Sequence, residues 1–467
     1  MKHLSAFPVL AILVAPAGLS VADPSLPAVT NRAAVVADRP GAPLAAWVVT
    51  NSVPGTNELT FGQFLNQVAQ ANLDYAAQRY NVAIAKAAIA IAKEFPNPTL
   101  NLLGAKDVRN WNRYLPDANG NQVSQTMPQP LGVGIEQPIE YFGKRKWRVR
   151  VADHAYRAAA ATLEDFAWNL KLDAAAAFAE ALATQRTYEQ QRQAAEYLGQ
   201  LVVAQRRRLE AGDISETDLI QSRVDELQFQ NDLLNAQNDA LVAQLSLSRF
   251  LGRREGRTTF IVRGKLELEP RSFDETQLLA RALQERPDLI ALRHARDGAQ
   301  SSIRLAKASR VPDVTVGLSY TYTSGSENFV APAEPDSMVG LTFSLPVPLW
   351  NRQKGEIQTA QLTAEQAQKT LDAAELRAEV QVRQAFGTYR TMTERVQKFQ
   401  SELLKGADEV LAAKRFGYEH GQTTLLDLLE AQRSANDIHQ SYNDALADAG
   451  KALIELERAT TVWDMAF

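Results

Sequence analysis

The chain has 467 residues, of which 45% are hydrophobic and 22% are charged, and its formal net charge is -4 at pH 7. This charge excludes the basic surface that proteins binding nucleic acid carry, so nucleic acid is not an expected partner. The chain has no cysteine, which excludes disulfide bonds, thiolate metal sites, cysteine nucleophiles and an acylated cysteine anchor.

Residues 1–22 have the pattern of a secretory signal peptide. Lys2 and His3 precede a mostly apolar stretch, and the small residues Ser20 and Ala22 stand where a signal peptidase would cleave. The alternative for this segment is a short buried helix. Residues 23–57 are rich in proline and alanine with few large apolar side chains, which predicts an extended, poorly ordered arm.

The rest of the chain contains one unit twice, at 58–252 and 273–460, with a linker at 253–272 and a tail at 461–467. Residues 61–104 align with 275–318 without a gap. The identical pairs include Gln63/Gln277, Asp74/Asp288, Arg79/Arg293, Lys93/Lys307, Pro98/Pro312, Ala152/Ala360, Arg206/Arg415, Gly212/Gly421 and Asp218/Asp427. Similarity over this length indicates an internal duplication, and it decides the fold before any local motif does.

Each repeat opens with a helical pattern, which in the first repeat runs from about 59 to 93, and continues into strands. The strands are expected at about 98–107 and 131–140 in the first repeat and at about 312–323 and 338–347 in the second. In the last pair, apolar residues alternate with small or polar ones, as in Val314, Val316, Leu318, Tyr320 and Tyr322.

Alternation over about ten residues is typical of strands in a transmembrane β-barrel, although a soluble hairpin with one wet face has the same pattern. Past the signal, no stretch is apolar for 18 residues, so a membrane-inserted form would have to be a barrel. Two strand pairs cannot close a barrel alone, so this interpretation requires an oligomer.

Very long helices are expected next, at about 147–211 and 356–420, and each returns through a helix at about 216–250 or 425–458. A helix of the first length spans roughly 100 Å. Apolar residues of the first return helix fall at heptad-like steps: Ile220, Val224, Leu227, Leu234, Leu241 and Leu245. Helices this long with narrow apolar stripes need neighbours to bury them.

Two turn sequences between the long and return helices resemble those of the TolC-type outer-membrane efflux family, the outer membrane factors. They are Glu-Ala-Gly-Asp-Ile-Ser-Glu-Thr-Asp-Leu at 210–219 and Tyr-Glu-His-Gly-Gln-Thr-Thr-Leu-Leu-Asp-Leu-Leu-Glu-Ala-Gln at 418–432. The likeness extends from about 59 to 460. The segment Gly-Ile-Glu-Gln-Pro-Ile-Glu-Tyr-Phe-Gly-Lys-Arg at 134–145 is further similar to the branch that serves cobalt-zinc-cadmium resistance.

The resemblance implies a mainly α fold with a membrane β-barrel. In a homotrimer, four strands per chain would form a twelve-stranded barrel in outer-membrane lipid, above a long periplasmic barrel of coiled-coil helices. The implied partners are a periplasmic adaptor, also called a membrane fusion protein, and an inner-membrane RND-type pump. The expected location is the cell outer membrane with a periplasmic extension.

The function implied is the exit duct of a tripartite efflux pump, with heavy-metal cations as cargo. A multidrug duct or a type I secretion duct of the same fold is the alternative. A periplasmic coiled-coil scaffold without a pore is a remote third possibility, and the alternating strands argue against it.

The resemblance also carries roles to particular residues. A periplasmic constriction would be formed by Asp427, Glu430, Tyr418, Asp218 and Thr217, with the Tyr418 hydroxyl meeting the neighbouring hairpin near Thr217 and Asp218. This chain departs from well-studied relatives at Thr423, where they have an arginine. The hairpin tips that contact the adaptor would be Gly212, Asp213, Gly421 and Gln422.

These residues also have simpler interpretations. Asp427 and Glu430 are acids at a helix start, favoured there by the helix dipole, and Asp218 is a possible helix cap. Lys144 and Arg145 open a basic cluster at a helix start, where the dipole disfavours them, so membrane-interface phosphates are expected to hold them; a solvated charged face is the alternative.

The sequence predicts no enzyme and no cofactor. It contains no phosphate-binding glycine loop, no nucleophile beside a base and no zinc signature. The histidines after His3 form no ligand spacing along the chain, so no dedicated metal site is expected; they are His154, His294, His420 and His439.

Overall fold

The structure, a computed structural model, describes residues 58–105, 114–116, 119–124, 128–252, 261–264, 271–326 and 332–463. The predicted signal peptide and the predicted extended arm lie outside the described residues. So do most of the predicted linker and residues 464–467 of the tail.

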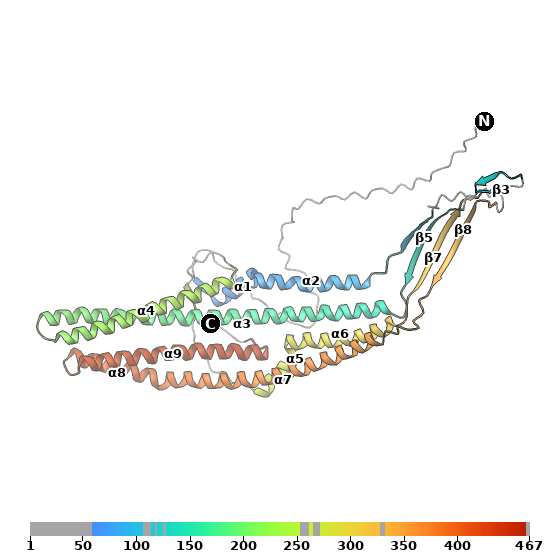
Figure 1. Cartoon of the computed structure of the whole chain (residues 1–467). Helices are drawn as coiled ribbons and strands as arrows, with labels where there is room; N and C mark the ends of the chain where they lie inside the picture. Colours follow the sequence, from blue (N-terminus) through green and yellow to red (C-terminus); the bar gives the residue numbers. More distant parts are fainter. Residues whose placement is uncertain are drawn as a thin grey trace. The chain divides into compact units, whose positions relative to one another are not determined.

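The two repeats have the same succession of main elements, two shorter helices, a strand pair and a long helical hairpin, as Figure 1 shows. The helices of the first repeat are α1 (Phe61–Ala71), α2 (Leu73–Lys93), α3 (Lys144–Glu210) and α4 (Glu216–Phe250). Those of the second are α5 (Glu275–Glu285), α6 (Pro287–Ser309), α7 (Lys354–Lys398), α8 (Leu404–Glu419) and α9 (Leu425–Thr460). Between α7 and α8 lies a π-helical turn, η1 (Phe399–Leu403).

The single helix predicted over 59–93 is wrong, because the chain breaks at Asn72. Asn72 has extended backbone angles, and its side chain accepts a hydrogen bond from the amide of Tyr75 at 2.9 Å, which starts α2. Asparagine is among the strongest residues for this position. The second repeat breaks at the equivalent place, where Pro287 begins α6. The proline has no amide hydrogen and suits the first turn of a helix.

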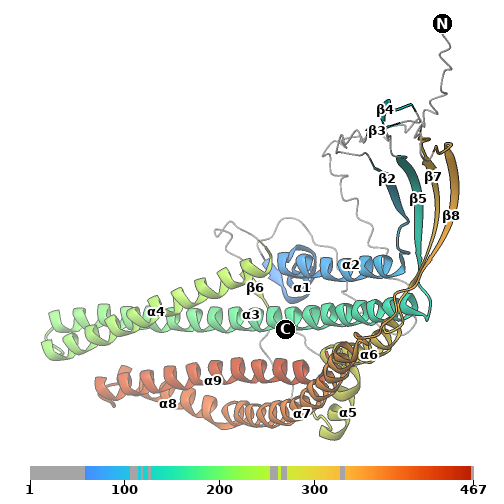
Figure 2. The same ribbon diagram turned by 45° about the vertical axis from the view of Figure 1, so that its right-hand side comes forward.

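The main sheet has four antiparallel strands in the order β2-β5-β7-β8 (Figure 2). They are β2 (Thr99–Gly104), β5 (Pro130–Ile139), β7 (Val314–Thr323) and β8 (Asp336–Ser344), so each repeat provides one neighbouring pair. β5 from the first repeat and β7 from the second join the two pairs at the middle of the sheet.

The strand register places the apolar side chains on one face. The pairing puts Leu102 opposite Val133, Val133 opposite Tyr320 and Tyr320 opposite Val339, so these four form one row across the sheet. A parallel row contains Leu100, Ile135, Leu318 and Leu341. All eight side chains are exposed, at 45% or more of their surface. The face therefore needs an apolar partner outside the chain.

The opposite face of the sheet has a row of small residues at its centre. Asn101, Gly134, Ser319 and Gly340 are paired across the four strands. A Cβ atom added at Gly134 would lie 3.3 Å from the Cβ of Ser319, and one added at Gly340 would lie 2.9 Å from its hydroxyl oxygen. The crowding along this row shows why its side chains stay small.

Two smaller pairings have no counterpart among the predicted elements. β1 (Glu58–Thr60) pairs in parallel with β6 (Ile261–Arg263), which lies inside the predicted linker. β3 (Tyr114–Pro116) and β4 (Gln122–Ser124) form a short hairpin within the loop between β2 and β5. Three-residue strands are too short to produce a readable alternation in the sequence.

The long helices pack side by side (Figure 2): α3 lies against α2, α4, α6 and α9, and α7 lies against α6 and α9. Much of the contact is through small residues, as in the buried Ala174, Ala175, Ala179 and Ala181 of α3. Among the described helices, none combines the length and the apolarity that crossing a membrane requires.

The heptad-like apolar residues of α4 do not form its contact with α3. All six, from Ile220 to Leu245, are exposed. The buried side of α4 instead carries Ser222, Asp225, Phe229, Ala236 and Ala243. Small residues let α4 approach α3 closely, and the larger apolar residues are left facing away from it.

An aromatic cluster fixes α1 against α3. Phe178 of α3 is fully buried, and its ring centroid lies 5.3 Å from that of Phe61 and 5.7 Å from that of Phe64. Phe250, at the end of α4, and Trp463 extend the cluster. The beginning of the first repeat is thereby packed onto the middle of its longest helix and beside the end of the second repeat.

Candidate functional site

The two helix hairpins, α3–α4 and α8–α9, end in turns of the same design. Gly212 has a φ of 80°, and its amide donates to the carbonyl of Leu209 while the amide of Asp213 donates to the carbonyl of Arg208. In the second hairpin Gly421 has a φ of 71° and Gln422 takes the role of Asp213. This double hydrogen bond is the Schellman motif, in which glycine is favoured because φ is positive. The four predicted adaptor residues are exposed at these turns.

Replacing Gly421 by alanine is expected to destabilise the protein by about 1–2 kcal/mol, because a Cβ atom is strained in the left-handed region. Nothing lies within 4 Å of the added Cβ, so the effect would be purely one of backbone conformation. Gly387, inside α7 and equally uncrowded, is the matched control, and its alanine variant should gain roughly 1 kcal/mol. Thermal denaturation of the two purified variants tests this; a loss at both positions would contradict it.

Both return helices begin with a capping box. The Ser215 side chain accepts from the amide of Asp218, and the Asp218 carboxylate accepts from the amide of Ser215. Thr424 and Asp427 repeat this at the start of α9. Reciprocal capping satisfies amides that a helix start would otherwise leave without partners.

Asp427 is further held by its surroundings. Its carboxylate accepts from the Thr424 hydroxyl at 2.7 Å and lies 3.5 Å from the Lys414 ammonium. The Thr424 hydrogen bonds, with help from Lys414, lower the pKa of the Asp427 carboxyl. The folded state therefore binds its proton less tightly than the unfolded state, and the stability that the cap contributes is lost as the pH falls through the folded pKa. Glu430 is exposed, in a shallow groove beside Arg433.

Tyr418 lies elsewhere than expected relative to the other predicted constriction residues. Its hydroxyl accepts hydrogen bonds from Gln205 at 2.9 Å and from Arg208 at 3.0 Å, both on α3. Asp218 is occupied as a cap, and Thr217 is exposed on the first turn of α4. Within one chain, Tyr418 thus joins α8 to α3 rather than to the start of α4.

Thr423 is fixed inside its own hairpin. Its hydroxyl donates to the carbonyl of Lys414 at 3.1 Å. A Cβ atom added at Gly417 would lie 2.8 Å from the Thr423 methyl, so the glycine makes the space that the threonine fills. Thr423 therefore closes the turn of α8–α9, and its hydroxyl is bonded within that hairpin.

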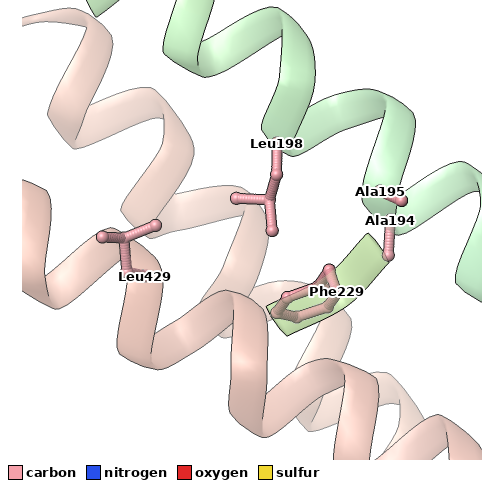
Figure 3. Packing of buried hydrophobic residues seen from close by; sticks show 5 residues of the cluster. All are labelled: Ala194, Ala195, Leu198, Phe229 and Leu429. Atoms are coloured by element: carbon pink, nitrogen blue, oxygen red, sulfur yellow. The ribbon is translucent and has the colours of Figure 1, made fainter. Parts of the chain in front are cut away.

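A small apolar cluster joins the two hairpins above their tips (Figure 3). Leu198 of α3, Phe229 of α4 and Leu429 of α9 converge in it, beside Ala194 and Ala195. Each of the three large side chains is exposed over 4% of its surface or less. The cluster is the apolar part of the contact between the first and second repeat near the tips.

An ion pair that no motif in the sequence indicates lies beside this cluster. Asp225 of α4 is buried and binds the guanidinium of Arg433 on α9, so the pair connects the two hairpins. Asp225 lies on the buried face of α4, and this position becomes recognisable only once the small-residue face of α4 is known to be the inner one. A charged residue on such a face then requires a partner.

Lys144 and Arg145 also have partners within the chain. Lys144 is buried, and its ammonium lies 2.7 Å from the carboxylate of Asp313, just before β7. This contradicts the expectation that lipid phosphates hold Lys144. The guanidinium of Arg145 lies over the ring of Phe95 at 4.0 Å from its centroid. Lys144 at the start of α3 therefore ties that helix to the sheet.

The fold brings together histidines that are far apart in the sequence. His154 of α3 lies beside His294 and Asp297 of α6, and one possible ligand atom from each lies within 4.8 Å of the others. The expectation of no metal site rested on spacing along the chain, and that spacing does not capture a cluster formed between two helices.

The described arrangement consists of a sheet with one exposed apolar face and of two hairpins held together by few contacts at their tips. A sequence family described as outer membrane efflux protein matches residues 64–253 and 278–461. These two ranges coincide with the two repeats of the fold.

Known relatives have similar sequences over most of the chain. The cobalt-zinc-cadmium resistance protein CzcC of Cupriavidus metallidurans is 24% identical over 400 residues, which cover 86% of this chain and 89% of CzcC. The outer membrane protein TolC of Vibrio cholerae is 22% identical over 70% of this chain and 76% of TolC.

Solved structures share the fold. The outer membrane channel CmeC of Campylobacter jejuni matches with a TM-score of 0.68 and 13% identity, covering 86% of this chain and 85% of CmeC. CusC, a protein whose structures were described in connection with transmembrane channel formation, matches with a TM-score of 0.67 and 17% identity, covering 88% of this chain and 95% of CusC.

Proposed function

Since this chain belongs to the outer membrane efflux protein family and is an outer-membrane efflux channel, we propose that it is the exit duct of a tripartite pump whose cargo is divalent heavy-metal cations. The observation that carries the cargo class is the similarity to a cobalt-zinc-cadmium resistance protein, which spans nearly the whole of both chains. The family and the fold are those of channels and not of enzymes.

Three chains would form the complete duct. β2 and β8 are the edges of the four-stranded sheet, and exposed edges are normally paired or covered. Joining the β8 edge of one copy to the β2 edge of the next would close a twelve-stranded barrel. The exposed apolar rows of the sheet would then face lipid, and the small-residue face would line the lumen.

The exposed apolar residues of α4 support the same assembly. Leu227 and Leu234 are exposed by 61% and 64% in one chain, although they recur at heptad steps. Such a stripe favours packing against the helices of a neighbouring copy. The helices of three chains would thus make a periplasmic wall, and the exposed tip turns at Gly212, Asp213, Gly421 and Gln422 would meet a periplasmic adaptor joined to an inner-membrane RND-type pump.

Growth of a deletion strain tests the cargo. The strain is grown across zinc, cobalt, cadmium, nickel, copper and silver salts and across a panel of hydrophobic drugs, each with plasmid rescue. We expect hypersensitivity to the metal salts, restored by the plasmid. Hypersensitivity to drugs alone would overturn the metal cargo and favour a multidrug duct.

Charge near the tips is proposed to select cations. In a trimer, Asp427 and Glu430 would each form a ring of three carboxylates, and like charges about 6 Å apart repel by roughly 3 kcal/mol at an effective dielectric of 20. Such rings attract cations and oppose anions. Because Lys414 lies 3.5 Å from Asp427 and offsets its charge, Glu430 is expected to contribute more.

The Asp427→Asn, Glu430→Gln double variant should therefore lower the cation preference of the channel, with most of the change reproduced by Glu430→Gln alone. The capping residue Thr424 is unchanged, and the side-chain oxygen of an asparagine at position 427 can still accept from the Thr424 amide, so the turn should be retained. The reversal potential across a planar bilayer in a salt gradient measures the preference. The control is Glu409→Gln, which changes an exposed glutamate on α8, away from the proposed rings. An unchanged reversal potential in the double variant would contradict the rings.

A further inference from the structure

We propose that His154, His294 and Asp297 form a binding site for a divalent transition-metal cation that joins α3 of the first repeat to α6 of the second. The site is independent of the proposed cargo, because a channel for any substrate could carry it in its wall.

The site is formed where two helices meet. His294 and Asp297 are three residues apart on α6, so both project from one side of that helix. His154 projects from α3, against which α6 packs. The two imidazole ring centroids are 6.2 Å apart, and a ligand atom from each of the three residues lies within 4.8 Å of the others.

These distances are close to those of an occupied site. Zinc–nitrogen and zinc–oxygen bonds are about 2.0–2.2 Å long, so two ligands of one ion lie at most roughly 4 Å apart. Small rotations of the side chains would bring the three ligand atoms within that limit. The residues are half-buried, so an ion can reach them while still being partly removed from solvent.

The space around His154 favours the same interpretation. The Nδ1 atom of His154 is buried and has no hydrogen-bond partner among the described residues. Gly298 is buried against it, and a Cβ atom added there would lie 3.3 Å from the Cβ of His154. The glycine therefore lets the backbone of α6 approach His154 closely. A buried ring nitrogen normally has a hydrogen-bond partner, so the unpaired Nδ1 of His154 favours a ligand at this place.

The ligand set indicates the class of ion. Two imidazoles and one carboxylate suit zinc, cobalt and nickel, whereas calcium and magnesium prefer oxygen ligands alone. Soft ions such as Cu(I) select thiolates and thioethers, and the chain has no cysteine. Three protein ligands leave the fourth position of a tetrahedral ion to water, so the bound ion would be exchangeable.

Neighbouring charges set a limit on the affinity. Arg296 donates to one oxygen of Asp297 from Nε at 3.0 Å and from Nη2 at 2.7 Å, which leaves the other oxygen for an ion. Beside His154, Asp153 is paired with Arg157 at 2.9 Å. The guanidinium of Arg296 opposes a cation, so binding should be weaker than at a closed structural zinc site.

Titration of the purified full-length channel with Zn²⁺ and Co²⁺ tests the site, with Ca²⁺ as the comparison ion. We expect one Zn²⁺ per chain, a Co²⁺ visible spectrum with nitrogen ligands, a rise in the unfolding temperature on Zn²⁺ addition, and no response to Ca²⁺. His154→Gln and His294→Gln should each lower the Zn²⁺ affinity at least about tenfold, as even second-shell changes can do.

The control is His439→Gln, because His439 pairs with a single carboxylate, Asp408, outside the cluster. It should leave binding and spectrum unchanged. Unaltered Zn²⁺ binding in both cluster variants, or loss of binding only in the control, would overturn the proposal. Circular dichroism verifies that each variant is folded. If a variant does not fold, the Co²⁺ spectrum of the wild-type protein still shows whether nitrogen ligands bind the ion.

Growth on metal salts distinguishes this proposal from the proposed function. Normal metal resistance in a strain carrying His294→Gln, together with lost Zn²⁺ binding in vitro, would support the site and leave the cargo unaffected. Metal sensitivity of the deletion strain without any Zn²⁺ bound to the purified channel would overturn the site alone.

Discussion

Arg433→Ala is expected to destabilise the channel by about 3–5 kcal/mol, because it leaves a buried carboxylate without its partner. The Asp225 side chain is 1% exposed and is bound by the guanidinium of Arg433. Its second oxygen has no hydrogen bond from any described residue. Arg433 itself is 44% exposed, so its removal would leave an unpaired charge at the edge of the helix interface, where water reaches it only in part.

The same variant should raise the basal conductance of the channel in a bilayer, because Asp225 and Arg433 belong to different hairpins. Unfolding in denaturant and single-channel recording measure the two effects. Arg281→Ala, which breaks an exposed pair with Glu285, is the matched control and should change stability by less than about 1 kcal/mol.

Replacement of both partners provides a further test. In Asp225→Leu with Arg433→Met, no charge is left buried, and much of the lost stability should return. If Arg433→Ala unfolded at the wild-type denaturant concentration, the pair would not hold the hairpins together.

Phe178→Ala should cost about 3–5 kcal/mol, the range for an aromatic side chain removed from a packed core. Phe178 is fully buried between Phe61 and Phe64. Its loss would open a cavity where α1 rests on α3, so α1 should also become more accessible to protease. Phe416, which is 58% exposed on α8, is the control for removal of a phenyl ring.

Thermal denaturation and limited proteolysis measure these effects on the purified protein. Phe178→Leu should recover part of the stability, since leucine fills part of the cavity. Equal losses for Phe178→Ala and Phe416→Ala would show that the aromatic cluster does not determine the stability of the helical wall.

The family resemblance predicted from the two turn sequences is confirmed by the match of both repeats to the outer membrane efflux protein family. Short sequence signals also explain why the positions of some helices and strands could be predicted. α4 begins at Glu216 because Ser215 and Asp218 form a capping box, which is readable as a serine followed three residues later by an acid. The strands could be placed because their alternation has a period of two.

The features that sequence analysis missed depend on contacts between distant segments. Asp225 and Arg433 lie 208 residues apart and meet only because α4 turns its small residues inward. His154 and His294 meet through the packing of α3 on α6. The apolar stripe of α4 was expected to need neighbouring helices, but periodicity identifies a stripe without saying which neighbour covers it.

The π-helical turn η1 shows how the two copies of the duplicated unit have diverged. Between Ala152/Ala360 and Arg206/Arg415 the second copy gains one residue, and η1 lies within that span. In an α-helix an inserted residue would turn every later side chain by about 100°. A wide turn absorbs such a residue locally, and Phe399 and Gln400 of η1 both contact Tyr442 on α9. A long helix can thus gain one residue during evolution while the face that it turns toward the neighbouring helix stays the same.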